Sequence, residues 1–219
     1  MINFDPEKHK YTDDEGNEFL SVTQLLSRMF PFEKEKIAEK VISNPNSVYY
    51  LMKKEDVLKQ WADSALLGTE VHEAVEAWIN KKTIPDSAKI KPLIEQFAKL
   101  PFTGTLSSEI LVWDQNYWLA GTVDIIEEKE DHCLIWDVKT SKAIAGDVLM
   151  KYSMQLEIYR RLVETRYNQP ARIGGIIWFA DYVRQGEKTQ LRIVHHSHCA
   201  ALADQLLAER KLELSNQSI

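Results

Sequence analysis

Apolar runs of strand length and longer stretches with helical period alternate along the second half of the chain. In residues 147–167 apolar side chains recur at helical spacing, as in a helix with one face against a core. A final helix is expected near residues 197–214. The runs that predict strands are residues 107–113, 117–126, 132–139, 173–180 and 190–195, with a further hairpin across 183–187. This order of strands and helices predicts an α/β (mixed α+β) fold with a mixed central sheet flanked by helices.

The first half of the chain is mostly helical by pattern. A short hairpin is expected across residues 3–19, and Ser21 or Thr23 can cap a helix that starts near Val22 and ends at Pro31. Further helices are predicted at residues 33–43, 52–81 and 90–99. We therefore expect a single domain over residues 1–219, with a hairpin and helical part in 1–100 and an α/β core in 101–219.

Two carboxylates and a lysine fall on the strands predicted at 117–126 and 132–139. Asp124 and Asp137 lie on opposite arms of one hairpin, where a carboxylate from each strand can share a divalent cation. Asp137 and Lys139 are two residues apart, so they point to the same face. Asp137 also interrupts an apolar run, where a carboxylate is costly unless paired or metal-bound. An Asp-x-Lys triplet alone is more typical of a surface Asp and Lys on an amphipathic strand. This context favours hydrolysis of a phosphodiester.

Two helical segments supply further polar groups. His72 and Glu76 lie one turn apart at the border of an apolar helix face, where the imidazole is a candidate metal ligand and Glu76 can orient it. The alternative is a half-buried histidine that only forms hydrogen bonds. Gln155 and Tyr159 are also one turn apart, placed to bind a phosphate oxygen, brace Lys139 or contact a nucleotide. The alternative there is ordinary helix packing.

These segments resemble, in sequence and in order, the RecB-type branch of the PD-(D/E)XK nuclease superfamily. The residues 19–26, F-L-S-V-T-Q-L-L, also resemble the opening of stand-alone members, of the phage-borne and mitochondrial genome maintenance exonuclease type. The resemblance covers roughly residues 17–180. It rests on G-T-x-x-H-x-x-x-E (68–76), G-x-V-D (121–124), D-x-K-T (137–140) and Q-x-x-x-Y (155–159).

The resemblance implies a restriction-endonuclease-like core with an N-terminal helical cap, and a role for each matching residue. The implied metal ligands are His72, Asp124 and Asp137, which would hold one or two Mg²⁺ or Mn²⁺ ions. Lys139 matches the catalytic lysine, with Gln155 and Tyr159 as an auxiliary motif at the catalytic centre. Glu76 and Glu109 are candidates for supporting the metal ligands without binding the ion, and Glu109 stands where these enzymes are often acidic.

Two features depart from the family pattern. Val123 replaces the proline that gives the superfamily its name, a change that RecB-type members tolerate. Some relatives also hold an iron–sulfur cluster on four cysteines, whereas this chain has only Cys133 and Cys199. We therefore expect no iron–sulfur cluster. The segment 195–199, H-H-S-H-C, matches no common zinc spacing, and no metal site is expected there.

The distribution of charge bears on substrate binding more than its sum. The net charge is −6, which argues against non-specific coating of nucleic acid. Residues 139–172 nevertheless carry seven basic against three acidic side chains. We expect DNA contacts at Lys142, Lys151 and Arg160, and at Tyr49 and Tyr50 in the helical part. The alternatives are a solvated helix face with ion pairs for the charges and core packing for the aromatics.

The sequence as a whole predicts a divalent-metal-dependent DNA nuclease that acts as an exonuclease on single strands or DNA ends. The expected roles are DNA replication, repair or recombination, and phage DNA processing. One alternative is a structure-specific or restriction-like endonuclease; another is a non-catalytic DNA-binding or scaffold module of a larger complex. A helicase or annealing protein is a candidate partner, and the oligomeric state stays open. No membrane span or signal peptide is expected. Two separate cysteines favour a reducing compartment, which is the cytoplasm of the cell or of a phage-infected host.

Overall fold

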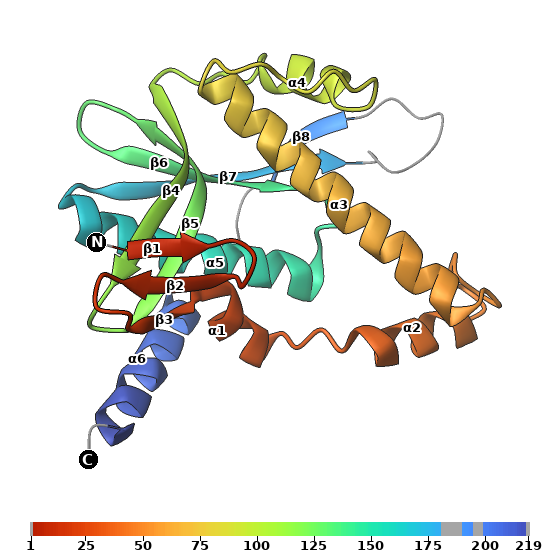
Figure 1. The fold of residues 1–219 in the computed structure, drawn as a ribbon, viewed down its shortest axis with the longest axis horizontal. Helices are drawn as coiled ribbons and strands as arrows, with labels where there is room; N and C mark the ends of the chain where they lie inside the picture. Colours follow the sequence, from red (N-terminus) through yellow and green to blue (C-terminus); the bar gives the residue numbers. More distant parts are fainter. Residues whose placement is uncertain (1, 181–189, 195–198, 218–219) are drawn as a thin grey trace.

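The computed structural model describes residues 2–180, 190–194 and 199–217, in which the strands form one mixed sheet covered by helices (Figure 1). The strands are β1 (Ile2–Asp5), β2 (Lys10–Asp13), β3 (Glu18–Ser21), β4 (Thr105–Asp114), β5 (Leu119–Glu128), β6 (Cys133–Lys139), β7 (Ala171–Ala180) and β8 (Gln190–Val194). The helices are α1 (Val22–Met29), α2 (Lys34–Ser43), α3 (Lys54–Ile79), α4 (Lys91–Phe97), α5 (Gly146–Tyr167) and α6 (Ala200–Gln217).

Helices cover both faces of the sheet. Helices α1, α5 and α6 share one buried cluster with β4–β7, in which Leu26, Leu156 and Leu206 take part. Helices α3 and α4 cover the other face and form a second cluster, which includes Val75 and Phe97. In Figure 1, α3 runs diagonally across the sheet, and its first half extends beyond the sheet to meet α2. The α/β fold with a mixed central sheet flanked by helices is confirmed.

Strand β5 lies at the centre of the sheet and has three partners. It pairs with β4 in antiparallel orientation along almost its whole length. On its other edge it pairs first with β3, in parallel through Leu119 and Ala120, and later with β6, antiparallel from Ile125 onward. Among the described residues, no strand forms a ladder with that edge between Ala120 and Ile125. The four residues 121–124 therefore face a break in the sheet.

The N-terminal residues form a three-stranded antiparallel meander. Within the hairpin predicted across residues 3–19, a turn joins β2 to β3, and β1 adds a further strand that pairs with β2. Ser21 then begins α1 with a capping box: its hydroxyl accepts the N–H of Gln24, and the Gln24 amide oxygen accepts the N–H of Ser21. This confirms the predicted start of the helix and fixes α1 to the end of β3.

Most predicted elements lie within a few residues of those observed. The helix expected at 52–81 is α3, and the helix expected at 147–167 is α5. The predicted hairpin across 183–187 and the histidine cluster of 195–198 lie outside the described residues. In the described part of the chain, no helix has both the length and the apolar character needed to cross a membrane.

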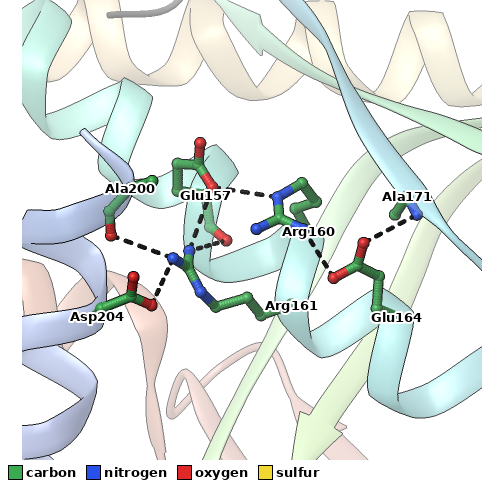
Figure 2. A network of polar contacts seen from close by, with 7 residues as sticks. All are labelled: Glu157, Arg160, Arg161, Glu164, Ala171, Ala200 and Asp204. Atoms are coloured by element: carbon green, nitrogen blue, oxygen red, sulfur yellow. Dashed lines mark hydrogen bonds and ion pairs between the residues drawn. The ribbon is translucent and has the colours of Figure 1, made fainter. Parts of the chain in front are cut away.

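A polar network joins α5 to its neighbours on the side of the helix shown in Figure 2. Arg161 contacts Glu157 in its own helix and reaches the carboxylate of Asp204 at 2.6 Å and the carbonyl of Ala200 at 3.1 Å, both in α6. Glu164 accepts the N–H of Ala171 at the start of β7. Because the charges are paired in a network, they fix the position of α6 on the core better than isolated surface pairs would.

Glu127 is a buried carboxylate near the end of β5, with 1 % of its surface exposed. It accepts hydrogen bonds from the backbone N–H groups of Thr103 and Gly104 and from the indole of Trp136, and it forms an ion pair with Lys129. Burial alone would raise the pKa of Glu127, but the hydrogen bonds from Lys129, Gly104 and Thr103 outweigh it and lower the pKa below the ordinary 4.5. This carboxylate anchors the segment before β4 to the sheet.

We predict that Glu127→Gln lowers the free energy of unfolding by about 2 kcal/mol at pH 7, because charge-assisted hydrogen bonds to a buried group are lost. The folded-state pKa is depressed, so this stabilisation is present above the unfolded pKa and disappears as the pH falls through the lower folded value. Urea unfolding of the wild type and of Glu127→Gln at pH 7 and pH 3 measures the difference in the free energy of unfolding. The variant Glu128→Gln, at an exposed neighbouring position, is the control. An equal difference at both pH values would contradict the prediction.

Candidate active site

The candidate site lies at the break in the sheet between β3 and β6. The ladder between β5 and β6 ends at Ile125 and Trp136, one residue short of Asp124 and Asp137. Beyond this point a side chain takes the place of a backbone hydrogen-bond acceptor: the Asp124 carboxylate accepts the N–H of Val138 at 2.7 Å. The two carboxylates thus come from adjacent strands at the point where their backbone pairing stops. This is the arrangement that the predicted hairpin required.

Asp137 and Lys139 form an ion pair on β6. The ammonium Nζ lies 2.6 Å from Asp137 Oδ1, and the amide of Gln155 in α5 donates to the same oxygen at 3.4 Å. Asp137 is 2 % exposed, and its second oxygen, Oδ2, has no hydrogen-bond partner in the described part of the chain. Burial raises the pKa of Asp137 to about 6 against the opposing charge of Lys139. Burying a carboxylate oxygen without a partner is costly, so this position favours a proton, a hydrogen-bond donor or a cation.

His72, Glu109 and Asp124 bring three donor atoms together from three elements. One ligand atom of each lies within 4.8 Å of the others. His72 Nδ1, in α3, is 3.8 Å from Asp124 Oδ1 and 4.0 Å from Glu109 Oε1. Burial opposes the charged imidazole, but the carboxylates of Asp124 and Glu109 outweigh it and raise the pKa of His72. The cluster therefore favours one added positive charge, which a proton or a metal ion can supply.

Glu109 owes its place to an unusual backbone conformation. By the register of β4 and β5 it stands opposite Asp124, yet the ladder pairs the residues on either side and leaves Glu109 and Asp124 unpaired with each other. The φ angle of Glu109 is +53°, in the left-handed region that a non-glycine residue adopts at a cost of about 1 kcal/mol. The alternation of β5 side chains between the two faces of the sheet is also interrupted here. Val123 and Ile125 are two residues apart, yet Val123 packs in the cluster under α5 and Ile125 in the cluster under α3 and α4. Local strain thus coincides with the candidate ligands.

The donor set fits a divalent metal ion. Carboxylate oxygens with one imidazole suit Mg²⁺ or, better, Mn²⁺. The residues that would hold the ion are His72, Glu109 and Asp124, and the unsatisfied Oδ2 of Asp137 is the further oxygen that a cation would satisfy. Glu109, expected from the sequence only to support the metal ligands, thus lies among the candidate ligands themselves. An ion there would also offset the mutual repulsion of the carboxylates.

Close packing fixes two elements around the site. A Cβ on Gly121 would lie 2.5 Å from the ring of Tyr159, so only glycine lets α5 approach β5 this closely. A Cβ on Gly68 would lie 3.0 Å from the hydroxyl oxygen of Thr140, which brings α3 against the end of β6. Burial raises the pKa of Tyr159 well above its ordinary value, so the hydroxyl remains a donor. Both glycines belong to motifs recognised in the sequence.

Other residues predicted for the site lie elsewhere or take other partners. Glu76 accepts hydrogen bonds from Asn80 at 3.4 Å and from Lys82 at 3.1 Å. Arg160 is engaged by Glu157 and Glu164 in the network of Figure 2 rather than with the carboxylate cluster. The acidic partners at i−3 and i+4 were visible in the sequence and favoured the ion-paired alternative.

The predicted nucleic-acid contacts partly come together beside the loop that follows β6. The Lys142 ammonium lies 5.0 Å from the ring centroid of Tyr49, which connects this loop to the segment between α2 and α3. Tyr49 also packs edge-on against Trp61. Tyr50 is exposed, at 43 %, and Lys151 is half-buried in the second turn of α5.

Two tyrosines near the site were not identified from the sequence. Tyr11 in β2 lies with its hydroxyl 3.2 Å from the Thr122 hydroxyl, two residues before Asp124. Nothing in the pattern of residues 2–13 indicated this contact. The ring of Tyr152 lies 4.9 Å from Lys139 Nζ. Its position, three residues before Gln155 on the same helix face, was the available signal.

Fold and site together define a mixed α/β protein with a carboxylate-rich candidate cation site beside an ion-paired lysine. The chain belongs to the PD-(D/E)XK nuclease superfamily, whose model matches residues 53–218. Membership implies a nuclease that depends on a divalent metal ion; the match does not distinguish the RecB-type branch. The solved structure of SSO0001 is similar over 89 % of this chain and 75 % of that chain, with 16 % identity and a TM-score of 0.40. No curated protein matches the chain.

The position of Glu109 predicts a difference between Glu109 and Glu76, the two acidic residues expected from the sequence to support the metal ligands. A ligand that binds only the folded state at 100 times its Kd stabilises it by about 2.7 kcal/mol. We predict that Mn²⁺ raises the melting temperature of the wild type and of Glu76→Gln equally, whereas Glu109→Gln loses most of the rise. Thermal unfolding with Mn²⁺ or with EDTA measures this. Equal losses in both variants would contradict the assignment of Glu109 as a ligand.

Proposed function

We propose that the chain is a divalent-metal-dependent DNA nuclease that hydrolyses phosphodiester bonds, acting as an exonuclease on single strands or DNA ends. The observation that carries the proposal is the cluster of His72, Glu109 and Asp124, with ligand atoms within 4.8 Å, next to the Asp137–Lys139 pair. Superfamily membership supports the hydrolytic chemistry. The preference for ends rests on the resemblance of the motifs to the RecB-type branch.

The residues have separable tasks in this proposal. His72, Glu109 and Asp124 hold the ion, with Oδ2 of Asp137 as a further oxygen, while Oδ1 of Asp137 holds the ammonium of Lys139. When bound, Mg²⁺ or Mn²⁺ supplies Lewis-acid stabilisation of the negative charge that develops on the phosphate. Lys139 remains protonated, because Asp137 and Asp124 outweigh the effect of burial and raise its pKa. Its ammonium can therefore donate hydrogen bonds to a phosphate oxygen and position the attacking water.

Gln155 and Tyr159 support this centre from α5. The Gln155 amide donates to the same Asp137 oxygen as Lys139 does, which limits the orientations open to the carboxylate. Tyr159, packed on Gly121, sets the distance between α5 and the strand that carries Asp124. Both side chains are buried. In the proposal they act by holding the catalytic groups in register.

The DNA strand would approach along the loop after β6. Lys142 lies there beside Tyr49, and Lys151 follows in the second turn of α5. Basic side chains beside an acidic metal site attract the phosphate backbone and leave the carboxylates to the ion. The exposed ring of Tyr50 is suited to stacking on a base. Arg160, engaged in ion pairs with α5 carboxylates, is not part of this proposed path.

Digestion of end-labelled DNA tests the proposed activity. Single-stranded, duplex and closed circular substrates are incubated with Mg²⁺, Mn²⁺ or EDTA, using wild type, Asp124→Asn and Lys139→Ala. We predict metal-dependent loss of linear DNA, survival of circles, and a fall of about 100-fold or more in both variants, because each removes charge stabilisation from the transition state.

The controls are matched to each substitution. Glu128→Gln changes an exposed carboxylate on the same strand as Asp124, and Lys89→Ala removes an exposed lysine outside the site; both should cleave as the wild type does. Cleavage of circles would replace the exonuclease with an endonuclease. Binding of DNA without cleavage under any metal condition would show a non-catalytic module and refute the proposal.

A further inference from the structure

We propose that Tyr152 is a positioning residue for Lys139, holding the ammonium in place through the face of its ring. This inference rests on the proposed nuclease function, since it assigns a task in the same site. Tyr152 belongs to none of the four motifs on which the family resemblance rests. The evidence is the contact between the tyrosine and the lysine, and the way the tyrosine itself is held.

The Lys139 ammonium has two close neighbours of different kinds. Asp137 Oδ1 lies 2.6 Å from Nζ, and the centroid of the Tyr152 ring lies 4.9 Å from it. An ammonium within about 6 Å of an aromatic centroid is attracted by the negative face of the ring. The carboxylate binds one N–H of the ammonium, and the ring covers another side. Lys139, with its flexible four-carbon stem, is thereby limited to few orientations.

Tyr152 is itself fixed at its far end. Its hydroxyl lies 2.6 Å from the Ser141 hydroxyl, in the loop that follows β6. The carbonyl of Ser141 accepts the indole N–H of Trp178, in β7, at 2.7 Å. The ring is therefore held between its own helix, α5, and a loop tied to a neighbouring strand. A half-buried tyrosine with both ends held can keep a mobile lysine in one position.

Helical geometry connects Tyr152 with the other groups of α5. Tyr152, Gln155 and Tyr159 are three and four residues apart in sequence, so they lie along one face of the helix. Gln155 contacts Asp137, and Tyr152 contacts Lys139, so the two partners of the ion pair are each approached from the same helix face. One face of α5 thus restricts the orientation of both the Asp137 carboxylate and the Lys139 ammonium.

Fluorinated phenylalanines at position 152 test the contact without changing its volume appreciably. Fluorine withdraws charge from the ring face, which weakens attraction for a cation while leaving packing in place. We predict that Tyr152→Phe cleaves within about threefold of wild type, that one, two and three fluorines lower the single-turnover rate stepwise to about tenfold below Tyr152→Phe, and that the affinity for DNA in EDTA stays unchanged. Ser141→Ala should resemble Tyr152→Phe.

The same substitutions at Tyr167, an exposed tyrosine at the end of α5, are the matched control and should leave the rate unchanged. A rate independent of fluorination at position 152 would overturn the inference, as would a loss of DNA affinity with an unchanged rate. If the wild type cleaves nothing, the proposed function fails, but the contact remains testable by NMR. The ε-methylene protons of Lys139 should then show a ring-current shift that Tyr152→Leu removes; its absence in the wild type overturns the inference independently.

Discussion

The candidate site depends on four residues of β5 that face a break in the sheet along one edge of the strand. Between its pairing with β3 and its pairing with β6, the strand presents Gly121 to Asp124 to a break in the sheet. Side chains complete what the backbone ladder leaves open: Tyr159 packs on Gly121, Tyr11 meets Thr122, and the Asp124 carboxylate takes the N–H of Val138. Unpaired backbone groups inside a protein must find partners. The N–H of Val138 finds its partner in the Asp124 carboxylate, which fixes that side chain at the break.

Electrostatics then gives the break its chemistry. Asp124, Asp137 and Glu109 concentrate negative charge in a partly buried space, and Lys139 with His72 offsets only part of it. Burial raises the pKa of Asp137, and the carboxylates of Asp124 and Glu109 raise the pKa of His72 against the effect of burial. A divalent cation would offset the negative charge of these carboxylates. The contrasting buried carboxylate, Glu127, has several hydrogen-bond donors and a lowered pKa.

The sequence predicted what local pattern and spacing determine. The β5–β6 hairpin with Asp124 and Asp137 and the helices around His72 and Gln155 follow from periodicity, and the fold class follows from their order. The place of Glu109 among the candidate ligands could not be predicted, because it depends on a left-handed backbone and a skipped ladder position. Tyr11 contacts the site across more than a hundred residues of sequence. For Arg160, by contrast, neighbouring acidic residues already indicated the ion pairs observed.

The central claim is that His72, Glu109 and Asp124 hold a divalent cation beside the Asp137–Lys139 pair. The most direct measurement is anomalous diffraction from crystals of the protein grown with Mn²⁺, because it locates the ion without reference to activity. The account predicts an anomalous peak bounded by these three side chains in the wild type, and its loss in Glu109→Gln. An ion bound elsewhere, or a saturated crystal with no peak at this cluster, would contradict it.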